Sequence, residues 1–283
     1  MIHELPLDQR TLHGRFSRDF EPVLAVEPGD SVRFAVPNAS WRLESGEQFV
    51  SRDPAIHDGH ALAGPIEVRG ARTGQTLAVR VDRVSPGSWG FTSTEREAFR
   101  WALEGGFGRA LDRTVSLAPF LGVMGMPPPE SGLHSTAPPR RWGGNIDCKE
   151  LVAGSTLYLP IPVDGALVSA GDGHAAQGDG EVSGTAIETP AEAQLTLDLR
   201  DDLPLEWPIA RTAAAWLTFG FDEHLGRAAR IAVDGMLDLL QREHGLGRDE
   251  ALAFASVVVD LRVTQVVNGV LGVHAVLADG ALR

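Results

Sequence analysis

Most of the side chains that could do chemistry lie in one short segment, residues 171–181. Its eleven residues include four glycines, three carboxylates, a histidine and a glutamine. Asp172 and His174 are two positions apart, so they share a face wherever the chain is extended, and Asp179 and Glu181 repeat this spacing. Such a segment can gather ligands around a divalent cation, or it can aim an acid and a base at a substrate carbonyl.

A second candidate segment is residues 143–149, which follows a proline-rich stretch. Asn145 could donate a hydrogen bond to a carbonyl oxygen, and Asp147 could ligate a metal. Cys148 could be a nucleophile, but its acidic neighbour would raise the pKa of the thiol, and free cysteine is more often a small buried side chain. Lys149 is the only lysine, and a single lysine is usually a solvated charge.

A third candidate segment, residues 53–65, carries two histidines beside an Asp-Gly turn. His60 precedes an expected strand and is the stronger metal-ligand candidate, whereas His57 is expected to be an exposed loop residue. A nucleophile elbow, a P-loop and a dinucleotide fingerprint after a strand are all missing from the sequence, which disfavours serine hydrolases, kinases and dehydrogenases.

The composition excludes several other classes of protein. The 283 residues carry a formal net charge of -13, without a basic cluster, so nucleic acid is not an expected partner. One cysteine permits no internal disulfide, and no run of apolar residues is long enough for a membrane span or signal peptide. We therefore expect a cytoplasmic protein that acts on a small molecule.

The hydrophobic patterning predicts a mainly β fold. Residues 23–26 and 31–36, and again 65–68 and 77–82, read as pairs of strands around glycine-containing turns, each interpreted as a β-hairpin. Residues 85–142 read as a long loop excursion, whereas 155–160, 166–170, 181–188 and 193–199 read as strands. Two helices are expected, at 223–244, capped by Asp222 and ended by Gly245, and from 249 to about 257, followed by a strand at 260–267. We divide the chain into a β-rich catalytic body, 1–205, and an α+β part, 206–283, packed on it.

The chain resembles the acetamidase/formamidase family in several ordered motifs. These are residues 143–147, 151–160, 165–167 and 171–181, with weaker matches at 60–65, where Ala61 and Ala63 depart from the family element, and at 121–127 and 265–268. The resemblance implies hydrolysis of short amides such as formamide or acetamide. It also implies a β-sandwich or barrel-like body with a small C-terminal α+β part, a divalent metal, Zn²⁺ or Ca²⁺, and a homodimer.

The mechanistic hypothesis is attack of a metal-activated water on the amide carbonyl. His60, Asp147, Asp172 and His174 would hold the ion, and Glu181 would move a proton to the leaving amine. The amide would be oriented by Asn145 or Gln177, with Asp179 supporting the site from behind. Two alternatives remain open: a metal-free amidase that uses Glu181 with Lys149 or Cys148, and a metal-stabilised binding protein without turnover.

Overall fold

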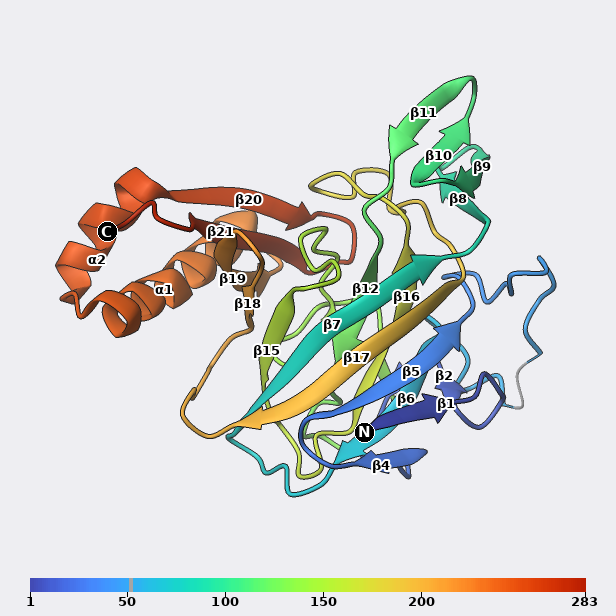
Figure 1. The fold of residues 1–283 in the computed structure, drawn as a ribbon, viewed down its shortest axis with the longest axis horizontal. Helices are drawn as coiled ribbons and strands as arrows, with labels where there is room; N and C mark the ends of the chain where they lie inside the picture. The colour runs from blue at the N-terminus through green and yellow to red at the C-terminus, as the bar shows by residue number, and fades with distance from the viewer. Residues whose placement is uncertain (51–52) are drawn as a thin grey trace.

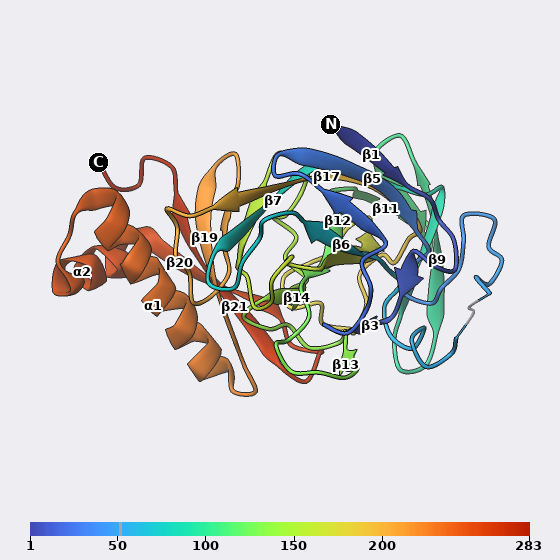
Figure 2. The same cartoon turned by 90° about the horizontal axis from the view of Figure 1, so that it is seen from below.

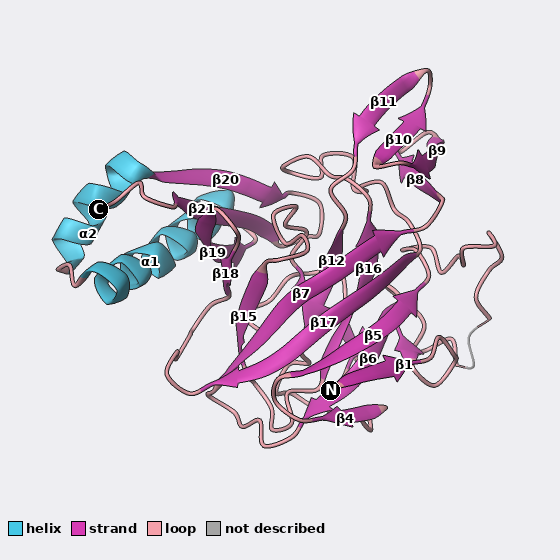
Figure 3. Ribbon diagram, viewed as in Figure 1, coloured by secondary structure: helices cyan, strands magenta, loops and turns pink. Residues whose placement is uncertain are grey.

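The computed structural model describes residues 1–50 and 53–283 and has a mainly β fold, as expected (Figure 3). Its largest sheet has nine strands. In spatial order these are β1 (Ile2–Leu5), β5 (Asp30–Val36), β17 (Ala191–Arg200), β7 (Thr76–Pro86), β15 (Thr156–Pro160), β18 (Ile209–Arg211), β19 (Ala215–Asp222), β21 (Leu271–Ala278) and β20 (Val259–Gln265). This sheet continues without a break from the N-terminal strand to the C-terminal hairpin.

A second sheet lies behind β7 and β17 in Figure 1. Its main path is β14 (Gly143–Asn145), β12 (Phe120–Gly125), β16 (Val168–His174), β6 (Leu62–Val68) and β2 (Leu12–His13), and β4 (Leu24–Val26) also pairs with β6. One continuous apolar core joins the two sheets, with Leu77 and Leu195 from the first and Leu121 and Val168 from the second. The body is therefore a β-sandwich.

The two expected hairpins are wrong, although their strands exist. β4 pairs with β6 in the second sheet, whereas β5 and β7 both pair with β17 in the first. Each strand–turn–strand unit therefore crosses from one layer of the sandwich to the other. The sequence predicts the turn but not the direction in which the next strand leaves it.

The expected excursion after residue 85 is more ordered than predicted. It forms an antiparallel four-stranded sheet of β8 (Trp89–Ser93), β9 (Ala98–Glu104), β10 (Phe107–Ala110) and β11 (Arg113–Ser116), which projects from the sandwich in Figure 1. Residues 127–142 remain mostly loop, apart from β13 (His134–Ser135), which pairs with β3 (Arg15–Phe16). The projecting sheet stands next to the segment that was expected to do chemistry.

Two helices cover the C-terminal end of the large sheet (Figure 2). The helix α1 (Leu225–His244) buries Ala228, Ala232 and Met236 against β19 and β21, and α2 (Arg248–Val258) packs beside it. Gly245 ends α1 in the left-handed conformation, as expected. The N-cap of α1 is His224 and not Asp222, whose carboxylate accepts a hydrogen bond from the His224 N–H instead. Neither helix among the described residues is long and apolar enough to cross a bilayer.

Candidate active site

The strand β16 positions two of the candidate residues. Asp172 and His174 belong to its C-terminal half, so the strand expected at 166–170 continues through His174. Their side chains meet: His174 Nε2 lies 3.3 Å from Asp172 Oδ2, and both residues are buried. Asp172 has a φ of 64°, a left-handed conformation that costs free energy in an L-residue and is often found at functional sites.

Gly122 on the neighbouring strand β12 leaves room for these side chains. A Cβ at this position would stand 2.6 Å from both Asp147 Oδ1 and Asp172 Oδ2, and 2.8 Å from His174 Cε1. Three functional side chains therefore converge on the space that glycine leaves open. No larger residue can occupy position 122 without displacing them.

Asp147 reaches this space from the turn that follows β14. Its backbone N–H donates to the carbonyl oxygen of Gly122, and its φ of 54° is again left-handed. Asn268, in the turn between β20 and β21, donates its side-chain N–H to Asp147 Oδ2 at 2.6 Å. The position of this carboxylate is therefore fixed from both sheets.

Two glutamates complete a carboxylate–histidine cluster, defined here as Asp147, Asp172, His174, Glu181 and Glu188. Ligand atoms of Asp147, His174 and Glu181 lie within 4.8 Å of one another, and so do those of Asp172, His174 and Glu188. Glu188 Oε2 lies 3.4 Å from His174 Nε2. The sequence prediction missed Glu188, which stands at the end of the expected strand 181–188 and belongs to no motif. Residues 181–188 form turns and isolated bridges in the structure, not the expected strand.

Gln177 orients His174 by contacting Nδ1, the ring nitrogen that does not face the carboxylates. Its Oε1 lies 3.0 Å from His174 Nδ1, and its Nε2 donates to the Asp147 carbonyl oxygen at 2.7 Å. The amide oxygen can only accept, so Nδ1 carries a proton and Nε2 is the atom that faces the carboxylates. A neutral imidazole in this tautomer would point a lone pair at Asp172 and Glu188. The arrangement thus requires a second proton or a cation between these groups.

Burial and mutual repulsion separate the pKa values of the cluster. Burial raises the pKa of Glu181 to about 7, with further contributions from Glu188 and Asp172. Burial and the adjacent Glu181 raise the pKa of Asp147 well above its usual value. Burial alone would lower the pKa of His174, yet Glu188 and Asp172 raise it well above its usual value. Burial opposes ionisation of Asp172 as well, but His174 and His60 hold the pKa of this carboxyl low.

The cluster fits a divalent cation. Asp147 Oδ1, Asp172 Oδ1 and Glu188 Oε2 are buried oxygens without a hydrogen-bond partner among the described residues. Leaving such atoms unpaired costs free energy, which a cation or a proton would recover. Carboxylate oxygens and an imidazole nitrogen suit Zn²⁺, and the excess of oxygen is also compatible with Ca²⁺.

The remaining predicted site residues lie at different distances from this cluster. His60 stands at its edge, with Nε2 3.9 Å from Asp172 Oδ2 and Nδ1 3.0 Å from the hydroxyl of Thr136. Asn145 is only 2% exposed, and its Oδ1 lacks a partner within the described chain. Asp179 pairs with Lys149 at 2.9 Å, and both side chains are about one-third exposed. This ion pair explains why Asp179 and Lys149 lie side by side, so neither residue needs a role in the cluster.

Cys148 is buried beyond the reach of a substrate. Its Sγ donates to Glu150 Oε2 at 3.2 Å, and the side chain is 0% exposed. Burial and the charge of Glu150 raise the pKa of the thiol well above its usual value. Because the nucleophile in cysteine chemistry is the thiolate, this environment disfavours that role.

A cavity of about 420 Å³ opens beside Glu181 and Gln177. The projecting sheet supplies one wall through Thr92, Trp101 and Val115. A cavity of this size admits a small organic molecule next to the cluster. Trp101 is held in place by a hydrogen bond from its indole N–H to the hydroxyl of Thr92 at 3.0 Å.

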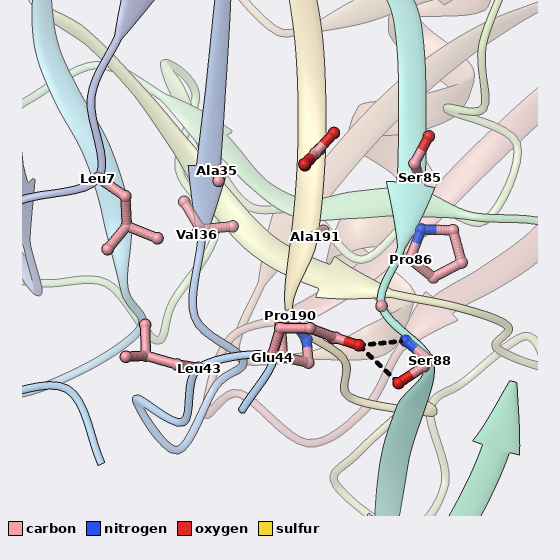
Figure 4. Close-up of a pocket in the computed structure, with 12 residues that line it drawn as sticks. Leu7, Ala35, Val36, Leu43, Glu44, Ser85, Pro86, Ser88, Pro190 and Ala191 are labelled. Carbon is pink, nitrogen blue, oxygen red and sulfur yellow. Dashed lines mark hydrogen bonds between the residues drawn. The ribbon is translucent and has the colours of Figure 1, made fainter. Parts of the chain in front are cut away.

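A different pocket of about 360 Å³ lies between the ends of β5, β7 and β17 (Figure 4). Its lining is largely apolar, with Leu7, Leu43 and Ala191. Figure 4 shows the Glu44 carboxylate, which accepts hydrogen bonds from the N–H and hydroxyl of Ser88. The lining also includes Glu192, but it contains no histidine and none of the cluster residues, and Glu44 is already engaged, so this pocket offers little for acid–base chemistry.

Comparison with known proteins identifies the family. The acetamidase/formamidase family model matches residues 3–114 and 130–276. The chain belongs to this family. It is 45% identical to an acetamidase of Mycolicibacterium smegmatis over 23% of this chain and 16% of that protein, and 25% identical to a formamidase of Methylophilus methylotrophus over 64% and 63% of the two lengths. It thus matches less than two thirds of the length of either relative. A crystal structure of an acetamidase from Bacillus halodurans has 26% identity and a TM-score of 0.86, with 97% of each chain covered.

Proposed function

We propose that this protein hydrolyses the C–N bond of short amides to a carboxylate and ammonia. The observation that carries the proposal is the buried carboxylate–histidine cluster, which lies adjacent to a cavity for a small molecule. Membership of a family whose named relatives include an acetamidase and a formamidase supports amides as the substrate class.

Asp147, Asp172 and His174 would hold a divalent ion, with Glu181, Glu188 and His60 completing its surroundings. When bound, such an ion lowers the pKa of a water ligand and polarises a carbonyl. Gln177 keeps His174 Nε2 turned toward this position. Asn145, whose Oδ1 lacks a partner among the described residues, is the amide side chain that would orient the substrate, because both ends of the Gln177 amide are engaged by His174 and Asp147.

Glu181 is suited to move the proton. It lines the cavity beside the cluster, and in the metal-free protein burial raises the pKa of its carboxyl to about 7, where a carboxyl can both accept and release a proton near neutral pH. In the proposed step, the water oxygen bonds to the carbonyl carbon while a water proton passes to Glu181. When the C–N bond breaks, Glu181 returns the proton to the nitrogen, which leaves as ammonia. Lys149 and Cys148 are not needed, because one is paired with Asp179 and the other is buried as a thiol.

The test is ammonia release from formamide, acetamide, propionamide and benzamide, before and after EDTA treatment and after adding Zn²⁺ or Ca²⁺ back. We expect turnover of the short amides, loss with EDTA, and recovery with one of the two ions. Asp172→Asn should abolish turnover, whereas the matched Asp179→Asn should leave it nearly unchanged. Failure of the untreated protein to release ammonia from every amide would overturn the hydrolase and favour a binding protein. Turnover that resists EDTA would overturn only the role of the metal and would leave the proposed hydrolase intact.

The proposal includes a cytoplasmic homodimer. Light scattering coupled to size-exclusion chromatography measures the mass in solution directly, and a mass of 30.2 kDa, that of one chain, would contradict the dimer.

A further inference from the structure

A second group of metal-ligand side chains lies outside the proposed active site. Cys148 Sγ, a carboxylate oxygen of Glu150 and a ring nitrogen of His274 lie within 4.8 Å of one another. They come from two distant parts of the chain, the turn after β14 and the strand β21. Glu150 Oε2 is central to the group, 3.2 Å from Cys148 Sγ and 3.7 Å from His274 Nε2.

His274 presents an unpaired nitrogen to this group. The side chain is 0% exposed, and its Nε2 has no hydrogen-bond partner within the described part of the chain. Its other nitrogen, Nδ1, lies 2.9 Å from the hydroxyl of Thr264. When Nδ1–H donates to that hydroxyl, Nε2 carries a lone pair directed toward Cys148 and Glu150, which is the form in which histidine binds a metal. Burial also lowers the pKa of His274 and so favours the neutral ring.

The spacing is close to that of a bound ion. In a tetrahedral zinc site, Zn–S of about 2.3 Å and Zn–N and Zn–O of about 2.0–2.2 Å place the ligand atoms about 3.3–3.6 Å apart. The two distances to Glu150 Oε2 bracket this range. Arg262 donates to the other oxygen, Glu150 Oε1, at 3.0 Å, and so holds the carboxylate with Oε2 turned toward the group.

We propose that Cys148, Glu150 and His274 form a site for a thiophilic divalent ion such as Zn²⁺, separate from the carboxylate–histidine cluster, with solvent as the fourth ligand. Binding would exchange the Cys148 thiol proton for a metal–sulfur bond and release that proton to solvent. The thiolate and the carboxylate would together balance the charge of the ion.

The site would fasten the turn carrying Asp147 to the β20–β21 hairpin. That hairpin already supplies Asn268 to the Asp147 carboxylate. Backbone hydrogen bonds also tie it to the other catalytic segment, from Gly180 N–H to Thr264 and from Val266 N–H to Gly180, next to Glu181. An ion here would thus be a structural support for both carboxylates. The inference does not require that amides are the substrate.

Cadmium provides a direct probe, because Cd²⁺ bound to a thiolate gives an ultraviolet charge-transfer band that carboxylate ligands do not give. We expect metal-free protein to develop this band on titration with Cd²⁺, and Zn²⁺ to abolish it by competition. The band should persist in Asp172→Asn, which alters only the other cluster. It should be lost in Cys148→Ser, and His274→Gln should weaken Cd²⁺ binding at least tenfold.

A second measurement uses the unaltered protein, in case a variant does not fold. X-ray absorption of protein loaded with Zn²⁺ should show a sulfur neighbour at about 2.3 Å. A zinc shell made of nitrogen and oxygen alone, or a cadmium titration of the wild type without the thiolate band, would overturn the proposal. In that case the three side chains form only a buried thiol–carboxylate contact.

Discussion

Replacing Glu181 with glutamine is expected to stabilise the metal-free protein while it removes activity. Glutamine has nearly the same shape, and the left-handed backbone at position 181, with a φ of 45°, is unchanged by the substitution. What changes is the cost of ionising a carboxyl group beside Glu188 and Asp172 in a buried site. An active-site residue that is suited to its chemistry is often poorly suited to the folded state.

The size of the effect follows from the pKa of Glu181, which is about 7 in the folded protein, whereas an unperturbed glutamate has a pKa of 4.5. The folded state binds the proton more tightly than the unfolded state, so the unfolding free energy of the wild type falls as pH rises from 4.5 to 7. One pKa unit is worth about 1.4 kcal/mol, so the full loss is about 3 kcal/mol, and about 2–3 kcal/mol of it falls between pH 5 and pH 8. Glu181→Gln cannot ionise and avoids this loss.

Urea unfolding of EDTA-treated wild type and variant at pH 5 and pH 8 measures the difference. We expect Glu181→Gln to gain about 2–3 kcal/mol over the wild type between the two pH values. The matched control is Glu95→Gln, because Glu95 is exposed. This substitution should change the unfolding free energy by the same small amount at pH 5 and at pH 8. If the unfolding free energy gained by Glu181→Gln did not grow with pH, the reasoning would be refuted, because ionisation of the Glu181 carboxyl would then not destabilise the folded protein.

Three further substitutions test the geometry of the site. Gly122→Ala should reduce kcat/KM for acetamide at least 100-fold, because the new Cβ would stand 2.6 Å from oxygens of Asp147 and Asp172. An unchanged kcat/KM would show that these carboxylates move freely. Asn268→Ala should lower kcat about 10- to 100-fold by freeing the Asp147 carboxylate, which steady-state kinetics can separate from a change in KM. Trp101→Ala should enlarge the cavity and raise kcat/KM for benzamide relative to formamide about tenfold, and an unchanged ratio would place the acyl group elsewhere.

The sequence predicted those features that depend on local spacing. Asp172 and His174 were predicted to lie on one face and their side chains do meet, although the left-handed backbone of Asp172 interrupts the extended strand. Gly245 ends α1 because glycine adopts the required left-handed conformation without cost. The mainly β fold follows from short alternating runs between glycine-containing turns, and it is what the structure has.

Features that depend on long-range pairing could not be predicted in this way. Glu188 enters the site from a segment that has no motif of its own, and Asn268 from the weakly matching segment 265–268, for which no site role was predicted. Only the packing of the two sheets brings them to His174 and Asp147. The projecting sheet was missed because its many glycines were interpreted as loop, although Phe99, Trp101 and Leu103 alternate with smaller or charged residues in β9. The hairpin error has the same origin, since a glycine turn can lead either to the adjacent strand or to the opposite layer.

Charge balance links the two groups of side chains. The carboxylate–histidine cluster places four acids around one imidazole, with His60 at the edge, and three of its buried oxygens lack partners among the described residues. Burying so many like charges is tolerated only if protons or a cation neutralise them. The β20–β21 hairpin contacts both Asp147 and the segment leading to Glu181, and it carries His274 on its other strand. An ion that holds this hairpin against Cys148 and Glu150 would therefore also oppose the repulsion that pushes the carboxylates of the cluster apart.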